Sequence, residues 1–146
     1  MRISPALLAP ILLAGTGPSQ QPLWQADLQI RKLTVSASHG NLIARVVVGS
    51  EFGEAMAARL EVLLPVGVGI VEMAAGCRPG PSAPNVPSLR ARVICLVGNL
   101  PSRASREYSV TTTTPPIGVT RQFGVIATSD TPDPKPGNNF AEKAVQ

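Results

Sequence analysis

The sequence is poor in aromatic, charged and catalytic side chains. Phenylalanine, tryptophan and tyrosine make up 3% of the 146 residues, and charged residues make up 15%, against about 25% in a typical soluble domain. The single histidine, His39, stands between Ser38 and Gly40, a setting typical of a turn, and no local motif supports a Ser-His-Asp triad. The sequence also lacks a phosphate-binding glycine loop and an HExxH metal motif. We therefore expect no enzyme and no cofactor.

The positive charge of the chain is dispersed rather than concentrated. The formal net charge is +4, yet there is no dense basic run and no interleaving of basic with aromatic residues. Nucleic-acid surfaces need clustered cations, and often rings on which bases stack. We therefore expect no nucleic-acid partner. The arginines that stand singly are Arg45, Arg59, Arg78, Arg90, Arg92, Arg103, Arg106 and Arg121.

The first residues follow the order of a secretory signal peptide. Residues 1–5 carry one basic side chain, residues 6–14 are apolar, and residues 15–17 supply the small side chains that a signal peptidase requires. The apolar run is too short to span a bilayer. Thr16 stands where a lipoprotein would need a cysteine, so no lipid anchor is expected. The alternative is an uncleaved N-terminal strand or tail.

These features predict the organisation of the chain and its compartment. We expect a signal peptide at residues 1–17, a linker at 18–25 and one domain at 26–146. Once the signal peptide is removed, no remaining segment is long and apolar enough for membrane insertion. The expected location is therefore extracellular, at the cell surface or in the periplasm.

Cys77 and Cys95 are the only cysteines. One pair in an exported chain predicts a disulfide, and closing a loop of this size should stabilise the fold by about 3 kcal/mol. A zinc site is disfavoured because two thiolates do not complete a tetrahedron, and His39 lies far away in the sequence. Two free buried thiols remain the alternative.

Short apolar segments separated by turn signals make up the body of the chain. Fifteen prolines and thirteen glycines favour turns over long helices. We count eight or nine short strands and expect an all-β, immunoglobulin-like antiparallel sandwich of about 7–9 strands. Residues 54–64 fit a helix or a strand equally well. The expected inward rows are Leu42, Ala44, Val46 and Val48; Ala58, Leu60, Val62 and Leu64; Tyr108, Val110 and Thr112; Phe123, Val125 and Ala127.

Two sets of polar residues suggest chemistry beyond folding. The first is a candidate calcium site, because carboxylate and amide oxygens suit Ca²⁺; its members are Asp27, Asp130, Asp133, Asn138 and Asn139. The alternative is that these side chains cap their own turn by bonding nearby backbone N–H groups. The second set is a candidate Lys–Asn isopeptide cross-link, formed by Lys32 and Asn139 with Glu61 as the buried acid. Its alternative is that these three are simply exposed polar residues.

Residues 130–139, with the sequence Asp-Thr-Pro-Asp-Pro-Lys-Pro-Gly-Asn-Asn, resemble the closing turn of the conserved-repeat domain of bacterial surface proteins, known as domain of unknown function eleven. That family typically ends in Asp-Pro-Asn-Pro-x-Asn-Asn and a last strand, and here Lys135 replaces the usual asparagine. Further matches, in order, are residues 26–28, 62–67 and 93–100; in the last of these the family's cysteine often has an upstream partner, as Cys77 would be. The resemblance implies an extracellular immunoglobulin-like sandwich with a structural or adhesive role and no catalytic residues.

Together these patterns predict an exported, non-enzymatic structural or adhesive surface module, and a candidate subunit of an extracellular assembly. The expected partners are other surface proteins or copies of the chain itself. The alternative is a soluble extracytoplasmic module that binds a protein or a glycan, with residues 78–88, a proline-rich loop, as its contact surface. The scarcity of aromatic rings argues against the stacking of sugars.

Overall fold

The computed structural model describes residues 24–81 and 91–145. The expected signal peptide, most of the expected linker and most of the proline-rich loop lie outside the described residues. Within them the chain forms nine strands and one short 3-10 helix. Their bounds are β1 Leu28–Ser38, β2 Asn41–Ser50, β3 Ala55–Leu63, β4 Ile70–Met73, β5 Cys77–Pro79, β6 Arg92–Leu100, β7 Ser105–Thr113, β8 Gln122–Thr128, η1 Pro136–Asn138 and β9 Phe140–Ala144.

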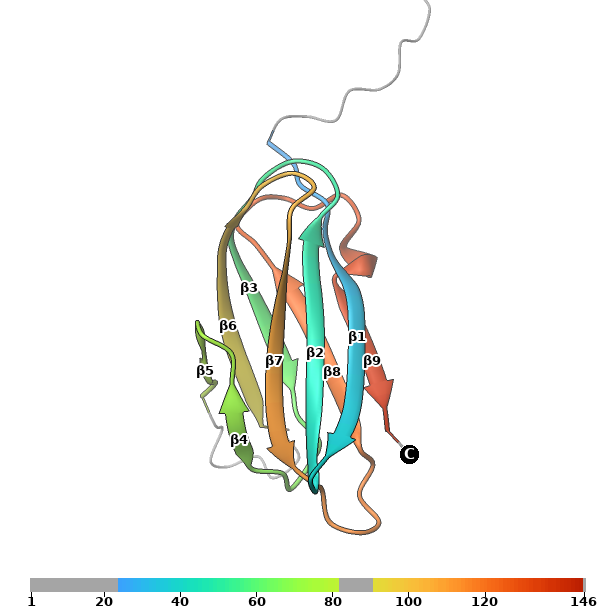
Figure 1. Ribbon diagram of the computed structural model, residues 1–146. Helices are drawn as coiled ribbons and strands as arrows, with labels where there is room; N and C mark the ends of the chain where they lie inside the picture. The colour runs from blue at the N-terminus through green and yellow to red at the C-terminus, as the bar shows by residue number, and fades with distance from the viewer. Residues whose placement is uncertain (1–23, 82–90, 146) are drawn as a thin grey trace, which may run out of the picture.

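The strands form two antiparallel sheets that pack face to face. One sheet has the order β1-β2-β7-β4 and the other has the order β5-β6-β3-β8-β9 (Figure 1). Strands β5 and β9 form the two edges of the five-stranded sheet, and β9 lies beside β1 of the other sheet. The expected all-β, immunoglobulin-like sandwich is confirmed, with a strand number in the expected range.

The core lies between the sheets and is built by alternation along each strand. Successive strand residues point to opposite faces, so every second apolar residue enters the core. All four expected inward rows are buried, and Phe123 is the largest side chain that is fully enclosed. Tyr108 and Thr112 are buried on β7 as predicted. The alternation of apolar residues in the sequence therefore predicted correctly which face of each of these strands is buried.

Two local irregularities follow from the sequence. The pairing of β1 with β2 shifts register between Ile30 and Lys32, which confirms the bulge predicted by the change of apolar phase. The turn between these strands consists of His39 and Gly40, which have φ angles of 48° and 79°. Both values lie in the left-handed region that two-residue hairpins require. The bulge lets β1 keep its apolar side chains on the core despite that change of phase.

Two expectations are corrected and one open alternative is settled. Residues 78–88 were expected to form a proline-rich loop from the start, but Cys77–Pro79 is a strand, because it pairs with β6. Alternation along the sequence also predicts that Ala91 shares a face with Val93 and Cys95, but Ala91 is exposed, because it precedes the start of β6. The ambiguous segment 54–64 is a strand rather than a helix, because β6 and β8 pair with it on both sides.

Candidate functional site

The cross-strand disulfide attaches a very short edge strand to the five-stranded sheet. Cys77 and Cys95 are directly opposite each other in the β5–β6 ladder, and their sulfur atoms are bonded. The backbone bonds flank this pair: Leu96 N–H donates to Gly76 O at 2.9 Å, and Gly80 N–H donates to Arg92 O at 2.8 Å. Three residues alone make a weak strand, so the covalent link is a main attachment of β5. The predicted disulfide is confirmed.

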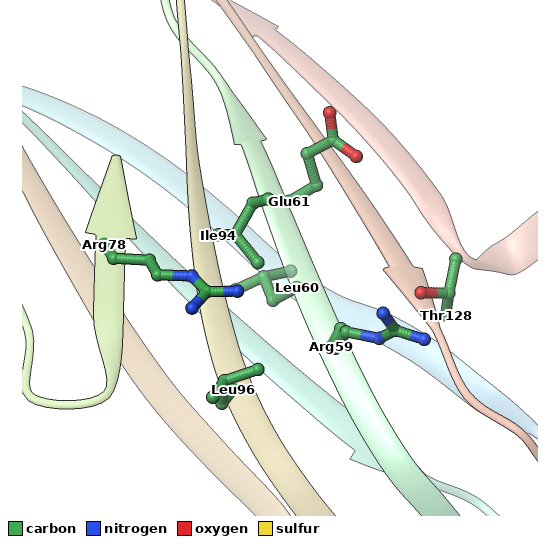
Figure 2. Close-up of a pocket in the computed structure, with 7 residues that line it drawn as sticks. All are labelled: Arg59, Leu60, Glu61, Arg78, Ile94, Leu96 and Thr128. Carbon is green, nitrogen blue, oxygen red and sulfur yellow. The ribbon is translucent and has the colours of Figure 1, made fainter. Parts of the chain in front are cut away.

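An open groove lies on the outer face of this sheet, across β5, β6 and β3. It is lined by Arg59, Leu60, Glu61, Arg78, Ile94, Leu96 and Thr128. Strand alternation explains this set except for Leu60, whose side chain is buried in the core. Because Cys77 and Cys95 face the core, the residues next to them in sequence face outward. In Figure 2 the Arg78 side chain runs from β5 across β6, and Arg59 extends toward Thr128.

Among the described residues, the guanidinium of one arginine in the groove has no partner. Arg92 pairs with Glu61 at 2.9 Å, and Arg59 pairs loosely with Asp130 at 3.8 Å. By contrast, within the part of the chain that the structure describes, no hydrogen bond or ion pair engages the guanidinium of Arg78. Its guanidinium therefore offers a full set of donors to an outside group.

The outer face around the groove also exposes aliphatic and aromatic side chains. One cross-strand row runs Arg78, Ile94, Glu61, Ile126 and Phe140, from one edge of the sheet to the other. Leu96 retains 54% and Phe140 48% of its possible exposure. The solvated face of an antiparallel sheet normally alternates to polar residues. Apolar side chains with a charged border are typical of surfaces that contact another molecule.

The two edges of the five-stranded sheet differ in their capacity to pair with another strand. At β5, the outward Cys77 N–H already donates to Ala74 O at 3.1 Å, and Pro79 has no N–H. At β9, Ala127 N–H bonds Asn139 O and Val145 N–H bonds Arg121 O. This alternation turns the backbone groups of residues 140, 142 and 144 away from β8. No hydrogen bond from the other described residues reaches these outward groups, so within residues 24–81 and 91–145 the β9 edge is open, although Glu142 and Lys143 place charges along it.

The candidate calcium residues form a structural lock rather than an open site. Asp27 is 2% exposed. Its Oδ1 accepts a hydrogen bond from Asn138 Nδ2 at 2.7 Å, and its Oδ2 lies 3.5 Å from Lys135 Nζ. Asp133 Oδ2 accepts from Leu28 N–H at 3.0 Å, and Asp133 Oδ1 accepts from Lys135 N–H at 2.7 Å. An ammonium and backbone donors thus occupy the carboxylate oxygens.

The other members of that set are placed differently. Asp130 lies beside Arg59, away from the Asp27 lock. Asn139 contributes its backbone oxygen to β8, and the side-chain Oδ1 atoms of Asn138 and Asn139 are buried without a hydrogen-bond partner among the described residues. Within residues 24–81 and 91–145, no three or more His, Cys, Asp or Glu side chains gather as a metal site. The geometry favours the turn-capping alternative, and calcium binding stays a hypothesis to be tested.

The candidate isopeptide residues are not brought together. Lys32 is exposed on β1 of the four-stranded sheet. Glu61 faces outward from β3 of the five-stranded sheet and pairs with Arg92. An isopeptide needs a buried acid beside both reacting groups, and Glu61 does not hold that place. The alternative of ordinary polar residues therefore describes Lys32 and Glu61.

The outward residues of β6 were missed as site residues at the sequence level. The sequence does carry a signal for them, because residues 93–97 are apolar at both phases of the strand. Such a run predicts cover on both faces. Val93, Cys95 and Val97 enter the core, whereas Ile94 and Leu96 face the groove. Nothing local to Arg78 identified it, because its place in the groove depends on β5 pairing with β6.

No protein-family model matches the chain, and no curated protein matches it. Several solved structures resemble its fold at low identity. ChBD2 from Thermococcus kodakarensis KOD1 is 11% identical, with a TM-score of 0.44, over 71% of this chain and 90% of that one. A Nocardia farcinica protein described as having an immunoglobulin-like fold is 10% identical, with a TM-score of 0.48, over 84% of this chain and 98% of that one. The chitin-binding domain of Chi18aC from Streptomyces coelicolor is 14% identical, with a TM-score of 0.43, over 73% of this chain and 92% of that one.

Likeness at these identities and TM-scores carries no conclusion about function. The two packed antiparallel sheets and the Cys77–Cys95 bond themselves define the class of protein, an immunoglobulin-like antiparallel β-sandwich with one cross-strand disulfide. The disulfide indicates an oxidising compartment. Among residues 24–81 and 91–145, no helix has the length and apolarity needed to cross a membrane.

Proposed function

We propose that this chain is an exported, non-enzymatic surface module with a structural or adhesive role, and that it contacts its partner through the outer face of the five-stranded sheet. The observation that carries the proposal is the half-exposed Leu96, which lies beside Arg78, a cation without a partner among the described residues. Burying a leucine side chain against a partner removes apolar surface from water and so makes the free energy of binding more favourable. Arginine next to exposed apolar residues is typical of protein interfaces.

The likeness of residues 130–139 to the closing turn of the conserved-repeat family supports an extracellular location and membership of that family. The disulfide agrees with that location, because such bonds persist outside the reducing cytoplasm. Partners of the proposed module are other surface proteins or copies of the chain. Assembly through the open β9 edge would use the backbone groups of residues 140, 142 and 144.

The proposal is tested by binding of the full chain to envelope preparations from its own cells, measured by co-sedimentation. We expect binding to weaken in Leu96→Ser and to be unchanged in Val71→Ser. Val71 is a matched control because it is 53% exposed but lies on β4, in the other sheet. Equal binding by both variants would remove the groove as the contact surface.

The size of the native protein separates assembly from solitary binding. Chain recovered from outside the cells as large, regular particles would support a subunit of an extracellular assembly. A monomer would favour the alternative, a soluble module that binds a protein or a glycan. Recovery of the chain only from the cytoplasm would contradict the proposed export.

A further inference from the structure

We propose that the groove binds an acidic peptide segment, with a carboxylate on Arg78 and an aliphatic side chain on Ile94 and Leu96. The inference rests on the proposed function, and it adds the chemistry of the partner. It follows from three features of the groove: the unmatched cation, the aliphatic surface beside it and the blocked edge of the sheet.

The cation is presented in a defined position. Cys77 is bonded to Cys95, so the next residue, Arg78, begins its side chain from a backbone that is fixed to β6. Arg59 and Arg92 already face Asp130 and Glu61, so among the described residues the guanidinium of Arg78 is left as the unpaired positive charge of the groove. The planar guanidinium suits a carboxylate, which it can bind through two parallel hydrogen bonds. Charge complementarity therefore selects an anionic partner.

The surface beside Arg78 selects a peptide over a sugar. Leu96 is 54% exposed, and Ile94 lies directly opposite Arg78 in the ladder. None of the seven residues that line the groove has an aromatic ring, and sugars are commonly held by stacking on such rings. Branched aliphatic side chains instead pack well against others of their kind. An acidic residue flanked by leucine, isoleucine or valine matches both parts of the surface.

The partner lies on the face of the sheet rather than along its edge. The outward backbone donor of Cys77 is taken by Ala74, and Pro79 has no donor to offer. An added strand at β5 would therefore find no free N–H group on these two residues. An acidic peptide suits the groove better than a second copy of the chain, because each copy carries a net charge of +4 and like net charges repel. Assembly of copies would use the β9 edge instead of the groove.

The experiment measures the affinity of the full chain for three probes by titration calorimetry at low and at physiological salt. The probes are a short peptide of alternating leucine and glutamate, the same peptide with lysine for glutamate, and oligogalacturonate as an acidic glycan. We expect only the glutamate peptide to bind, and salt to weaken it. Arg78→Ala should lower its affinity about fivefold, and Leu96→Ser about tenfold.

Matched controls lie on the opposite sheet. Arg45→Ala removes an exposed arginine of β2, and Val71→Ser removes an exposed aliphatic side chain of β4. Neither should change the affinity for the glutamate peptide. All four variants should keep the thermal unfolding midpoint of the original chain, because all four altered side chains are exposed to solvent.

Several outcomes would overturn the inference. These are equal binding of the two peptides, an Arg45→Ala effect as large as that of Arg78→Ala, and Arg78-dependent binding of oligogalacturonate without binding of the peptide. Failure of the glutamate peptide while envelope binding still depends on Leu96 would reject the acidic peptide and leave the proposed function standing. Envelope binding that is the same for Leu96→Ser and the original chain would reject the proposed contact surface itself.

Discussion

The carboxylate of Asp133 accepts a hydrogen bond from the backbone N–H of Leu28 at 3.0 Å, across 105 residues of sequence. The same carboxylate accepts from the N–H of Lys135, so it holds the closing turn and the start of β1 together. Beside it, Lys135 and Asn138 engage the buried Asp27. The turn that resembles a family signature thus has a structural task, which is to close the sandwich at one end.

Replacing Asp133 should therefore destabilise the fold. Asp133→Ala leaves the N–H groups of Leu28 and Lys135 without this acceptor, and we expect the free energy of unfolding to fall by about 1–3 kcal/mol. Urea unfolding followed by circular dichroism measures the change. Asp130→Ala is the control, because its ion pair with Arg59 is more than half exposed on both sides and should contribute under about 1 kcal/mol. Similar losses in the two variants would contradict a special role for Asp133.

Gly53 is required by the loop that follows β2. Its φ angle is +69°, and a Cβ atom there would lie 2.0 Å from the backbone oxygen of Gln25. The left-handed backbone alone costs a residue with a Cβ about 1–2 kcal/mol, and the contact with rigid backbone adds to it. Gly53→Ala should lower the free energy of unfolding by at least that amount. Gly137→Ala is the control, because a Cβ there would meet nothing within 4 Å, and it should leave the free energy of unfolding nearly unchanged. If Gly137→Ala lowered the free energy of unfolding as much as Gly53→Ala, the explanation would be refuted.

The disulfide should stabilise the fold and hold the groove in place. Replacing Cys77 and Cys95 together by serine removes the link between β5 and β6, and we expect a loss of about 3 kcal/mol. The affinity for the glutamate peptide should fall as well, because the backbone that carries Arg78 is no longer held to β6 by the disulfide. Adding a reductant to the original chain should reproduce both effects and should do nothing to the double variant. An unchanged unfolding midpoint in reductant would count against this role.

Calcium should not alter stability. The oxygens of Asp27 and Asp133 already accept from Lys135, Asn138 and backbone N–H groups. Binding a cation there would have to displace the Lys135 ammonium. We expect the melting temperature to be the same with added calcium and with a chelator. A rise with calcium that disappears in Asp27→Asn would restore the metal hypothesis.

The intact mass of the protein recovered from its own cells should show no loss of ammonia. Glu61 faces Arg92 on the outer face of the five-stranded sheet, while Lys32 is exposed on the other sheet. Glu61 therefore does not hold the place of the acid that would promote a bond between Lys32 and Asn139. Mass spectrometry of the reduced protein decides the point, and a deficit of one ammonia would mean that a cross-link forms.

Much of the fold could be predicted because strand alternation is a local property. Leu42, Ala44, Val46 and Val48 show their common face in the sequence, whichever strands lie beside them. The bulge at Ile30–Lys32 is also visible, since the apolar phase changes there. The pairing of the two cysteines followed from their number and the expected compartment.

The groove could not be predicted because it depends on which strands become neighbours. Arg78, Ile94 and Arg59 belong to three strands, and β3 joins β6 on one side and β8 on the other only through pairings that are distant in sequence. The short β5 has too few residues to show a period of its own. Similarly, no local pattern links Asp133 to Leu28.

By itself, the sequence determined the kind of structure: short alternating strands, a disulfide and an outer surface with few charges. Each of these follows from interactions between residues close in the chain or from the composition as a whole. Only the tertiary structure decided which apolar residues of β6 enter the core and which remain exposed, and that Arg78, whose guanidinium has no partner among the described residues, lies beside the exposed ones. The physical reason is that alternation sets two faces for a strand, whereas the packing of the second sheet chooses the face that is buried.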